Sequence, residues 1–233
     1  MHKRNSTQKK QAGNILFLIL LAVVLFAALS YAVTQSLRGG GQNASKEKAQ
    51  TFASQLLQHV SLIENTITRA MLVNNIPEYG FDFASLGTLS AANANCTSIN
   101  CAIYSSKGGG VPDLTIPDWA SISSVPNERR ADIRLAKILN VGTAKDEVVV
   151  KYQKLTQSVC EAINQMLGIA DVDITSTSEI WGSSNFYTGT MTSIPDNQGA
   201  ILGDQLSALV GKKAFCFQHS NEGYTFVYAI VER

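Results

Sequence analysis

The sequence is poor in charged residues, and the part beyond residue 46 has no cluster of basic ones. Charged residues make up 16% of the chain, against roughly 25% in an ordinary soluble domain. This shortfall indicates that part of the chain is not built for contact with water. Six of the nineteen basic residues precede residue 47, so the remainder carries thirteen basic and eighteen acidic residues. Nucleic-acid binding is therefore excluded, because phosphate contacts need a concentrated basic face.

The common motifs of catalytic sites are also missing. The chain contains no Gly-x-Ser-x-Gly, no His-Glu-x-x-His, no phosphate-binding loop and no Gly-x-Gly-x-x-Gly. Its three histidines, His2, His59 and His219, are far apart and offer little material for acid–base catalysis or metal binding. We therefore expect a protein that is not an enzyme and that has no metal site and no cofactor.

One long apolar run stands out against this background. Ile15 to Val33 holds 19 residues without a charge, and as a helix it would extend about 28 Å, close to the thickness of a bilayer's hydrocarbon core. We predict a transmembrane helix over residues 14–34. The alternative is a secretory signal cleaved after Ala32, because Ser30-Tyr31-Ala32 has the spacing of a cleavage site.

The flanking charges predict the orientation of this helix. A short basic leader, residues 1–13, carries four basic side chains, Lys3, Arg4, Lys9 and Lys10, whereas only Arg38 follows the run within ten residues. Basic segments stay on the cytoplasmic side. We expect a single-pass membrane protein with a cytoplasmic N-terminus and the remainder of the chain across the membrane.

The four cysteines agree with a location outside the cytoplasm. Cys96, Cys101, Cys160 and Cys216 all follow the apolar run. Cys96 and Cys101 are spaced for a small disulfide loop rather than for a zinc or redox pair. Three connectivities are possible, and the simplest pairs Cys96 with Cys101 and Cys160 with Cys216. Such bonds persist in an oxidising compartment.

A second helical pattern follows the membrane segment. Gly39, Gly40 and Gly41 predict a hinge or break within residues 35–44. An amphipathic helix is predicted over residues 45–76, because apolar side chains recur there every three or four residues. These apolar positions are Phe52, Leu56, Val60, Ile63, Ile67 and Met71. We expect this stripe to pack on its own domain, with a partner helix as the alternative.

The rest of the chain, residues 77–233, is predicted to be an α+β head. The pattern indicates a strand at 147–152, a helix at 156–167 that ends at Gly168, and an edge strand at 171–175. Residues 214–218 and 224–231 alternate around a polar turn and predict an antiparallel β-hairpin at the C-terminus. A Cys160–Cys216 bond would join that helix to that hairpin.

This layout resembles that of type IV pilins and type II secretion pseudopilins. The shared features are a basic leader that ends in Gly13, an immediate transmembrane helix, an amphipathic continuation and a disulfide-containing α+β head. Cys160 within VCEAIN and the late Cys216 look like the cysteines of the type IVb subgroup. The resemblance implies that a prepilin peptidase cuts between Gly13 and Asn14, and that other pilin-like subunits and an assembly machinery are the partners.

The sequence departs from the family at the fifth mature position, where Leu18 replaces the usual Glu. In the family a subunit without this Glu is typically a minor one at the filament tip. Small residues for close helix packing remain, namely Ala22, Ala27, Ala28 and Ser30. The resemblance therefore implies a minor pilin-like subunit of the bacterial inner membrane whose head is periplasmic or on an extracellular filament. The alternative is a membrane-anchored or secreted periplasmic binding domain that never polymerises, for which Leu18 is the chief argument.

Overall fold

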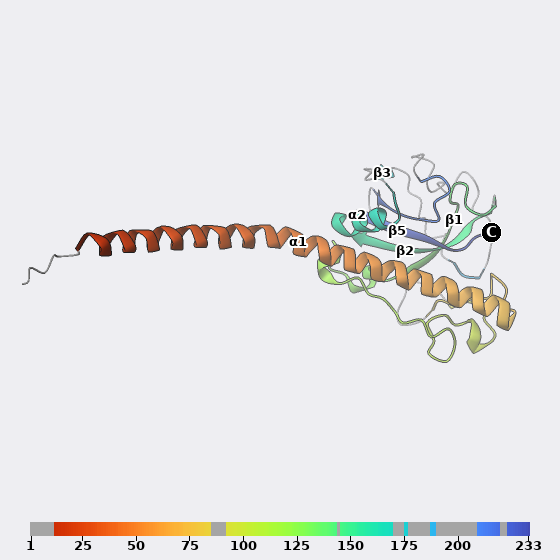
Figure 1. Ribbon diagram of the computed structural model, residues 1–233. Coiled ribbons are helices and arrows are strands. Elements are labelled where there is room, and N and C mark those ends of the chain that lie inside the picture. The colour runs from red at the N-terminus through yellow and green to blue at the C-terminus, as the bar shows by residue number, and fades with distance from the viewer. Residues whose placement is uncertain are drawn as a thin grey trace, which may run out of the picture. The chain divides into compact units, whose positions relative to one another are not determined.

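The chain forms two compact units in the computed structural model. Met1–Glu47 is the membrane-segment unit and Lys48–Arg233 is the folded unit. The structure describes residues 12–84, 92–143, 145–169, 175–176, 187–189, 209–219 and 223–233. One helix, α1 (Ala12–Asn74), contributes to both units (Figure 1). Of the basic leader expected over residues 1–13, all but the last two residues lie outside the described residues.

Helix α1 is continuous over Gly39, Gly40 and Gly41, where the sequence predicted a hinge or a break. No break occurs because glycine weakens a helix without being incompatible with it, and the hinge stays a prediction. Each helical glycine costs about 1 kcal/mol relative to alanine, yet its backbone adopts helical dihedral angles freely. The boundary between the two units falls after Glu47, shortly beyond the segment predicted as a hinge.

The folded unit has an α+β architecture built around a five-stranded sheet. The strand order is β1-β2-β5-β4-β3. The first four strands in this order pair with one another in antiparallel fashion. These four are β1 (Asp132–Ala136), β2 (Glu147–Leu155), β5 (Gly223–Val231) and β4 (Ala214–His219). The short β3 (Thr175–Ser176) lies at the edge and pairs in parallel with β4.

The elements predicted around the sheet are present. The strand expected at 147–152 is β2, and the C-terminal hairpin is β4 with β5. The helix expected at 156–167 is α2 (Gln157–Met166), and Gly168 follows it with a φ of +67°, which glycine adopts without steric cost. Of the predicted edge strand at 171–175, only Thr175 is among the described residues.

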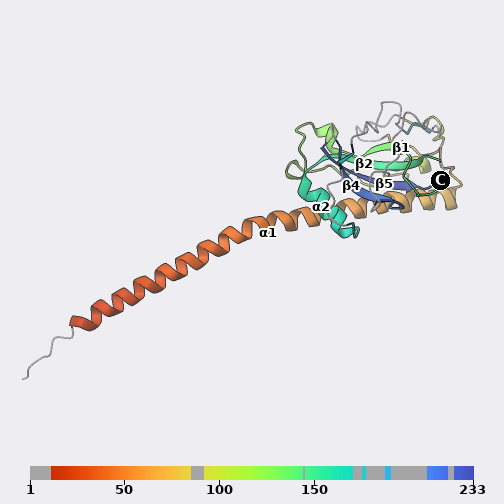
Figure 2. The same cartoon turned by 90° about the horizontal axis from the view of Figure 1, so that it is seen from above.

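One face of the sheet packs against the part of α1 that belongs to the folded unit (Figure 1 and Figure 2). The apolar stripe predicted on this helix is buried, as expected for packing on its own domain. Phe52, Leu56, Val60, Ile63 and Ile67 are all at most 3% exposed. Their partners on the sheet include Ile133, Val150 and Phe226. The helix ends where Asn75 takes a φ of +52° and Pro77 follows.

The opposite face of the sheet is apolar as well. Alternate residues of the central strands, including Val149, Phe215 and Val227, form a second buried cluster. The strands are therefore buried on both faces. Three short 3-10 helices complete the described elements of the head, namely η1 (Ile99–Cys101), η2 (Asp118–Ala120) and η3 (Pro126–Arg129).

Candidate functional site: membrane anchor and packing surfaces

Helix α1 contains a stretch that is long and apolar enough to cross a membrane. Leu16–Gln35 has a mean hydropathy of 2.8 over 20 residues, and none of it is buried within the protein. The exposed fraction of its large apolar side chains ranges from 46% at Leu21 to 73% at Phe26. Exposure of so much apolar surface is unfavourable in water and favourable in lipid. This surface therefore fits a membrane anchor.

The few polar side chains of the stretch lie at its C-terminal end and bond within the helix. The Thr34 hydroxyl donates to the carbonyl of Ser30 at 2.8 Å. The Gln35 amide donates to the Tyr31 hydroxyl at 3.0 Å. Polar groups near a bilayer need such partners because hydrocarbon offers none. The end of the span is thus compatible with an interfacial position.

The residues predicted for processing and for helix packing all lie on α1. Gly13 and Asn14 are the second and third residues of the helix. Leu18 is 56% exposed. At 100° per residue, Ala22, Ala27 and Ala28 point to different sides of the helix, so they and Ser30 form no single row of small residues. A neighbouring helix can therefore approach this helix closely on several of its sides.

The outward face of α1 in the folded unit is uncharged over almost twenty residues. Its exposed side chains from residue 51 to 68 are Thr51, Gln55, Gln58, Leu62, Asn65 and Thr68. An open depression of about 440 Å³ lies on this face. It is lined by Ser54, Leu57, Gln58, Ser61, Leu62 and Asn65. A surface helix normally carries charge on its solvent side, and charged residues are depleted at the centres of protein interfaces.

The only Asp, Glu, Lys or Arg between Ala49 and Thr68 is tied to the sheet. Glu64 accepts hydrogen bonds from the Lys213 ammonium at 2.8 Å and from the Tyr228 hydroxyl at 2.5 Å. Lys213 also lies 5.2 Å from the centre of the Tyr228 ring. Burial and the neighbouring Glu64 carboxylate raise the pKa of Tyr228. These contacts fix α1 to the hairpin and remove the one charge from the outward face.

Two disulfide bonds stabilise the head. Cys96 bonds to Cys101 and Cys160 bonds to Cys216, which is the simplest of the three possible connectivities. Next to the second bond, the Asn164 amide donates to the carbonyl of Cys216 and accepts from its backbone N–H, both at 2.8 Å. Helix α2 is therefore held against strand β4 by one covalent bond and two hydrogen bonds.

His59 is part of a buried network in the core. One ring nitrogen lies 2.8 Å from the Pro112 carbonyl and the other lies 2.8 Å from the Tyr152 hydroxyl. A carbonyl can only accept, so Nε2 carries the proton and Nδ1 accepts from Tyr152. Burial lowers the pKa of His59. This histidine is thus a neutral structural residue with both ring nitrogens satisfied.

A cluster of buried charges on the sheet was missed by the sequence reasoning. The Asp132 carboxylate lies 2.7 Å from Arg134 Nε and 3.8 Å from Lys151 Nζ, and the Lys151 side chain is fully buried. Asp132 and Lys151 are directly opposite in the β1–β2 ladder. The available signal was Lys151 within the apolar run of the predicted strand at 147–152. Only the strand register shows that these charges meet.

Glu147 gives the head a pH-dependent stability. Its carboxylate accepts from the Ile138 N–H at 2.8 Å, and its other oxygen has no hydrogen-bond partner. Burial, with help from the nearby Asp146 and Glu232 charges, raises the pKa of Glu147 to about 7. Between about pH 4.3 and 7 the folded state therefore holds a proton that the unfolded state releases. Stability from this group falls as the pH rises through that window.

We expect Glu147→Gln to remove this loss. The variant should resemble the parent in thermal midpoint near pH 4.5 and exceed it at pH 8, where the parent buries a charge. His59 also makes stability depend on pH, because stability falls on acidification below about pH 6.5. This effect is the same in both proteins. The difference between their thermal midpoints, measured across pH 4.5 to 8, therefore reports on Glu147 alone. A difference that does not grow with pH would contradict the assignment.

Among the described residues, no three His, Cys, Asp or Glu side chains gather as they would around a metal ion. The exposed features of the described residues that could serve a function are the apolar span, the uncharged face of α1 and the apolar side chains exposed on the head. Comparison with models of protein families, with curated proteins and with solved structures gives no match.

Proposed function

We propose that the protein is a pilin-like structural subunit, in the role of a minor subunit, of a type IV pilus or a type II secretion-like filament. It is held in the inner membrane by residues 16–35 before assembly, with its head in the periplasm. Asn14 becomes the N-terminus after a prepilin peptidase cuts behind Gly13. The protein has no catalytic role, and its partners are the lipid bilayer, other pilin-like subunits and their assembly machinery.

The observation that carries this proposal is the surface of α1. The helix offers lipid or neighbouring helices an apolar span that is unburied in the protein itself. Farther along, its outward face offers uncharged side chains around an open depression. Burying such a face against another helix costs no desolvation of charge. A helix with these two surfaces is suited to lateral packing in a filament.

Leu18 supports the minor role. A charge-free span has no carboxylate to pair with the terminal ammonium of a subunit beside it, so this subunit gains nothing electrostatically from being followed by a copy of itself. Its association rests on van der Waals fit, which the small residues Ala22, Ala27, Ala28 and Ser30 provide on several sides. A place at the filament tip agrees with the missing carboxylate, because no subunit lies above the tip to supply a terminal ammonium.

Processing at Gly13 is the direct test. Protein recovered from membranes should begin at Asn14 by N-terminal sequencing, with an intact mass that agrees. Gly13→Val should block the cut and leave the protein starting at Met1, because a peptidase pocket that accepts glycine excludes a branched side chain. Gly41→Val is the matched control, since it changes a glycine of the same helix and should leave processing unchanged.

The other results identify the rival functions. A parent protein that starts at Met1 would be a simple membrane anchor for a binding domain. One that starts at Val33 would be a secreted soluble domain. Unchanged processing in Gly13→Val would count against the proposal even if the parent starts at Asn14.

A further inference from the structure

Three apolar side chains protrude from one short loop of the head. Trp119 is 48% exposed, Ile122 is 60% exposed and Val125 is 48% exposed. They follow one another at intervals of three residues between Pro117 and Pro126. We call these three residues the apolar loop patch. None of the three belongs to the buried core clusters, so burial in the core does not account for their exposed surface.

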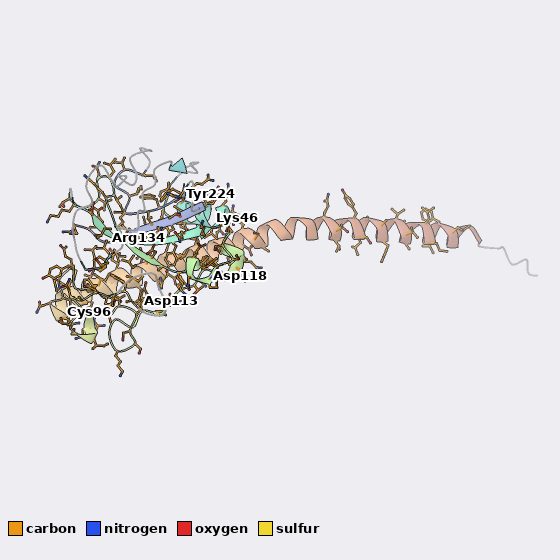
Figure 3. The ribbon with its side chains drawn as sticks, turned by 180° about the vertical axis from the view of Figure 1, so that it is seen from behind. Lys46, Cys96, Asp113, Asp118, Arg134 and Tyr224 are labelled. Carbon is orange, nitrogen blue, oxygen red and sulfur yellow. A yellow bond between two sulfur atoms is a disulfide. The ribbon has the colours of Figure 1, made fainter. Side chains whose placement is uncertain are left out.

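The apolar loop patch lies at the end of the head where α1 enters the folded unit. The Trp119 ring packs edge-on against Phe52, with ring centres 5.8 Å apart. Ile122 donates its N–H to the carbonyl of Lys154, near the end of β2. Figure 3 shows the neighbouring Asp118 at this end, together with Tyr224 of β5, whereas Cys96 lies at the opposite end.

Chain connectivity limits how far this end of the head can lie from the end of the span. Residues 36–47 are all that separates the end of the span at Gln35 from Lys48. Even fully extended, twelve residues reach only about 40 Å. Phe52, the contact of Trp119, is the fifth residue of the folded unit. The apolar loop patch is therefore on the part of the head with the shortest tether to the membrane.

The composition and size of the patch favour lipid over protein as its occupant. Tryptophan concentrates at membrane–water interfaces, because its ring is apolar and its N–H stays hydrogen-bonded to water or headgroups. Three side chains are too few for a stable protein interface, which needs about 800 Å² and 20 to 30 residues from each partner. Shallow insertion beside an existing anchor needs far less area.

We propose that Trp119, Ile122 and Val125 insert into the headgroup region of the bilayer that holds α1, and so seat the head on the membrane surface. The inference rests on residues 16–35 spanning the membrane, but not on assembly into a filament. It assigns to the head a second membrane contact, which would have to be released before the head could leave the surface.

The chain contains two tryptophans, which makes a direct test possible. Full-length Trp181→Phe, reconstituted in phosphatidylcholine–phosphatidylglycerol vesicles, has Trp119 as its only indole. Replacing these lipids with versions brominated near the headgroup should strongly quench its emission. If Trp181→Phe fails to fold, the same question can be answered with Trp119→Phe. Bromine should quench part of the emission of the parent protein, and this quenched part should be missing in Trp119→Phe.

Ile122→Ser is expected to reduce the quenching of Trp119 several-fold, while Ile99→Ser, which changes an isoleucine that is 52% exposed in η1, should leave it unchanged. Unquenched Trp119 in a protein that resists alkaline extraction from the vesicles would overturn the proposal. A blue-shifted emission that depends on protein concentration but not on bromine would assign the patch to a second copy. If alkali extracts the protein from the vesicles, residues 16–35 do not span the membrane, and this proposal is wrong as well.

Discussion

Replacing Cys160 and Cys216 by serine should lower the free energy of unfolding by about 4 kcal/mol. The bond joins residues 56 positions apart, so its loss frees a long loop in the unfolded chain. The same substitution also loosens α2 from β4, where the hydrogen bonds of Asn164 and the apolar packing of α2 would remain. Chemical unfolding of the full-length protein under oxidising conditions measures the effect.

The second disulfide provides the matched control. Cys96 and Cys101 are only five positions apart, and opening so short a loop should cost about 2 kcal/mol. Replacing both with serine should therefore destabilise the head by about half as much. Equal losses for the two double variants would show that loop length does not set the contribution of the long bond. No loss on removing Cys160 and Cys216 would contradict the bond's stabilising role.

Leu56→Ala should destabilise the folded unit by about 2–5 kcal/mol. The Leu56 side chain is fully buried between α1 and the sheet, so its removal leaves a cavity as well as losing burial. The loss in unfolding free energy can be measured with the same chemical denaturation. The result would establish that this part of α1 is integral to the head's core rather than a separate connecting helix.

Leu62→Ala is the control on the same helix. Leu62 is 44% exposed and faces the open depression, so truncating it should change stability by no more than about 0.5 kcal/mol. If the uncharged face packs against another helix, Leu62→Ala should weaken association while leaving the monomer stable. Equal destabilisation by Leu56→Ala and Leu62→Ala would contradict the placement of the apolar stripe.

The two proposed interactions use different surfaces of the protein. Packing in a filament would use the uncharged face of α1, whereas seating on the bilayer would use the apolar loop patch. The two surfaces consist of different residues, from residues 51–68 in one case and residues 119–125 in the other. Variants of Leu62 and Ile122 can therefore separate assembly from membrane contact in the same protein.

Local sequence was sufficient to predict the apolar span, the amphipathic helix, β2, α2 and the C-terminal hairpin, but not β1. The apolar run, the 3.6-residue stripe from Phe52 to Ile67 and the alternating hairpin each depend on neighbours within a few residues. Patterns of this kind record burial directly, and they recur in the structure as the span, the buried face of α1 and strands β4 and β5. The glycine triplet causes no break because weak helix propensity is overridden in a long helix.

Tertiary structure alone decided which distant residues meet. Glu64 reaches Lys213 and Tyr228, and Asp132 faces Lys151, because strand order and register bring together segments that lie far apart in the chain. The high pKa of Glu147 and the low pKa of His59 likewise follow from burial, which depends on the whole core. The sequence determined what each segment can form, because those preferences are local. Folding determined what surrounds each side chain, because packing joins residues that are far apart in the sequence.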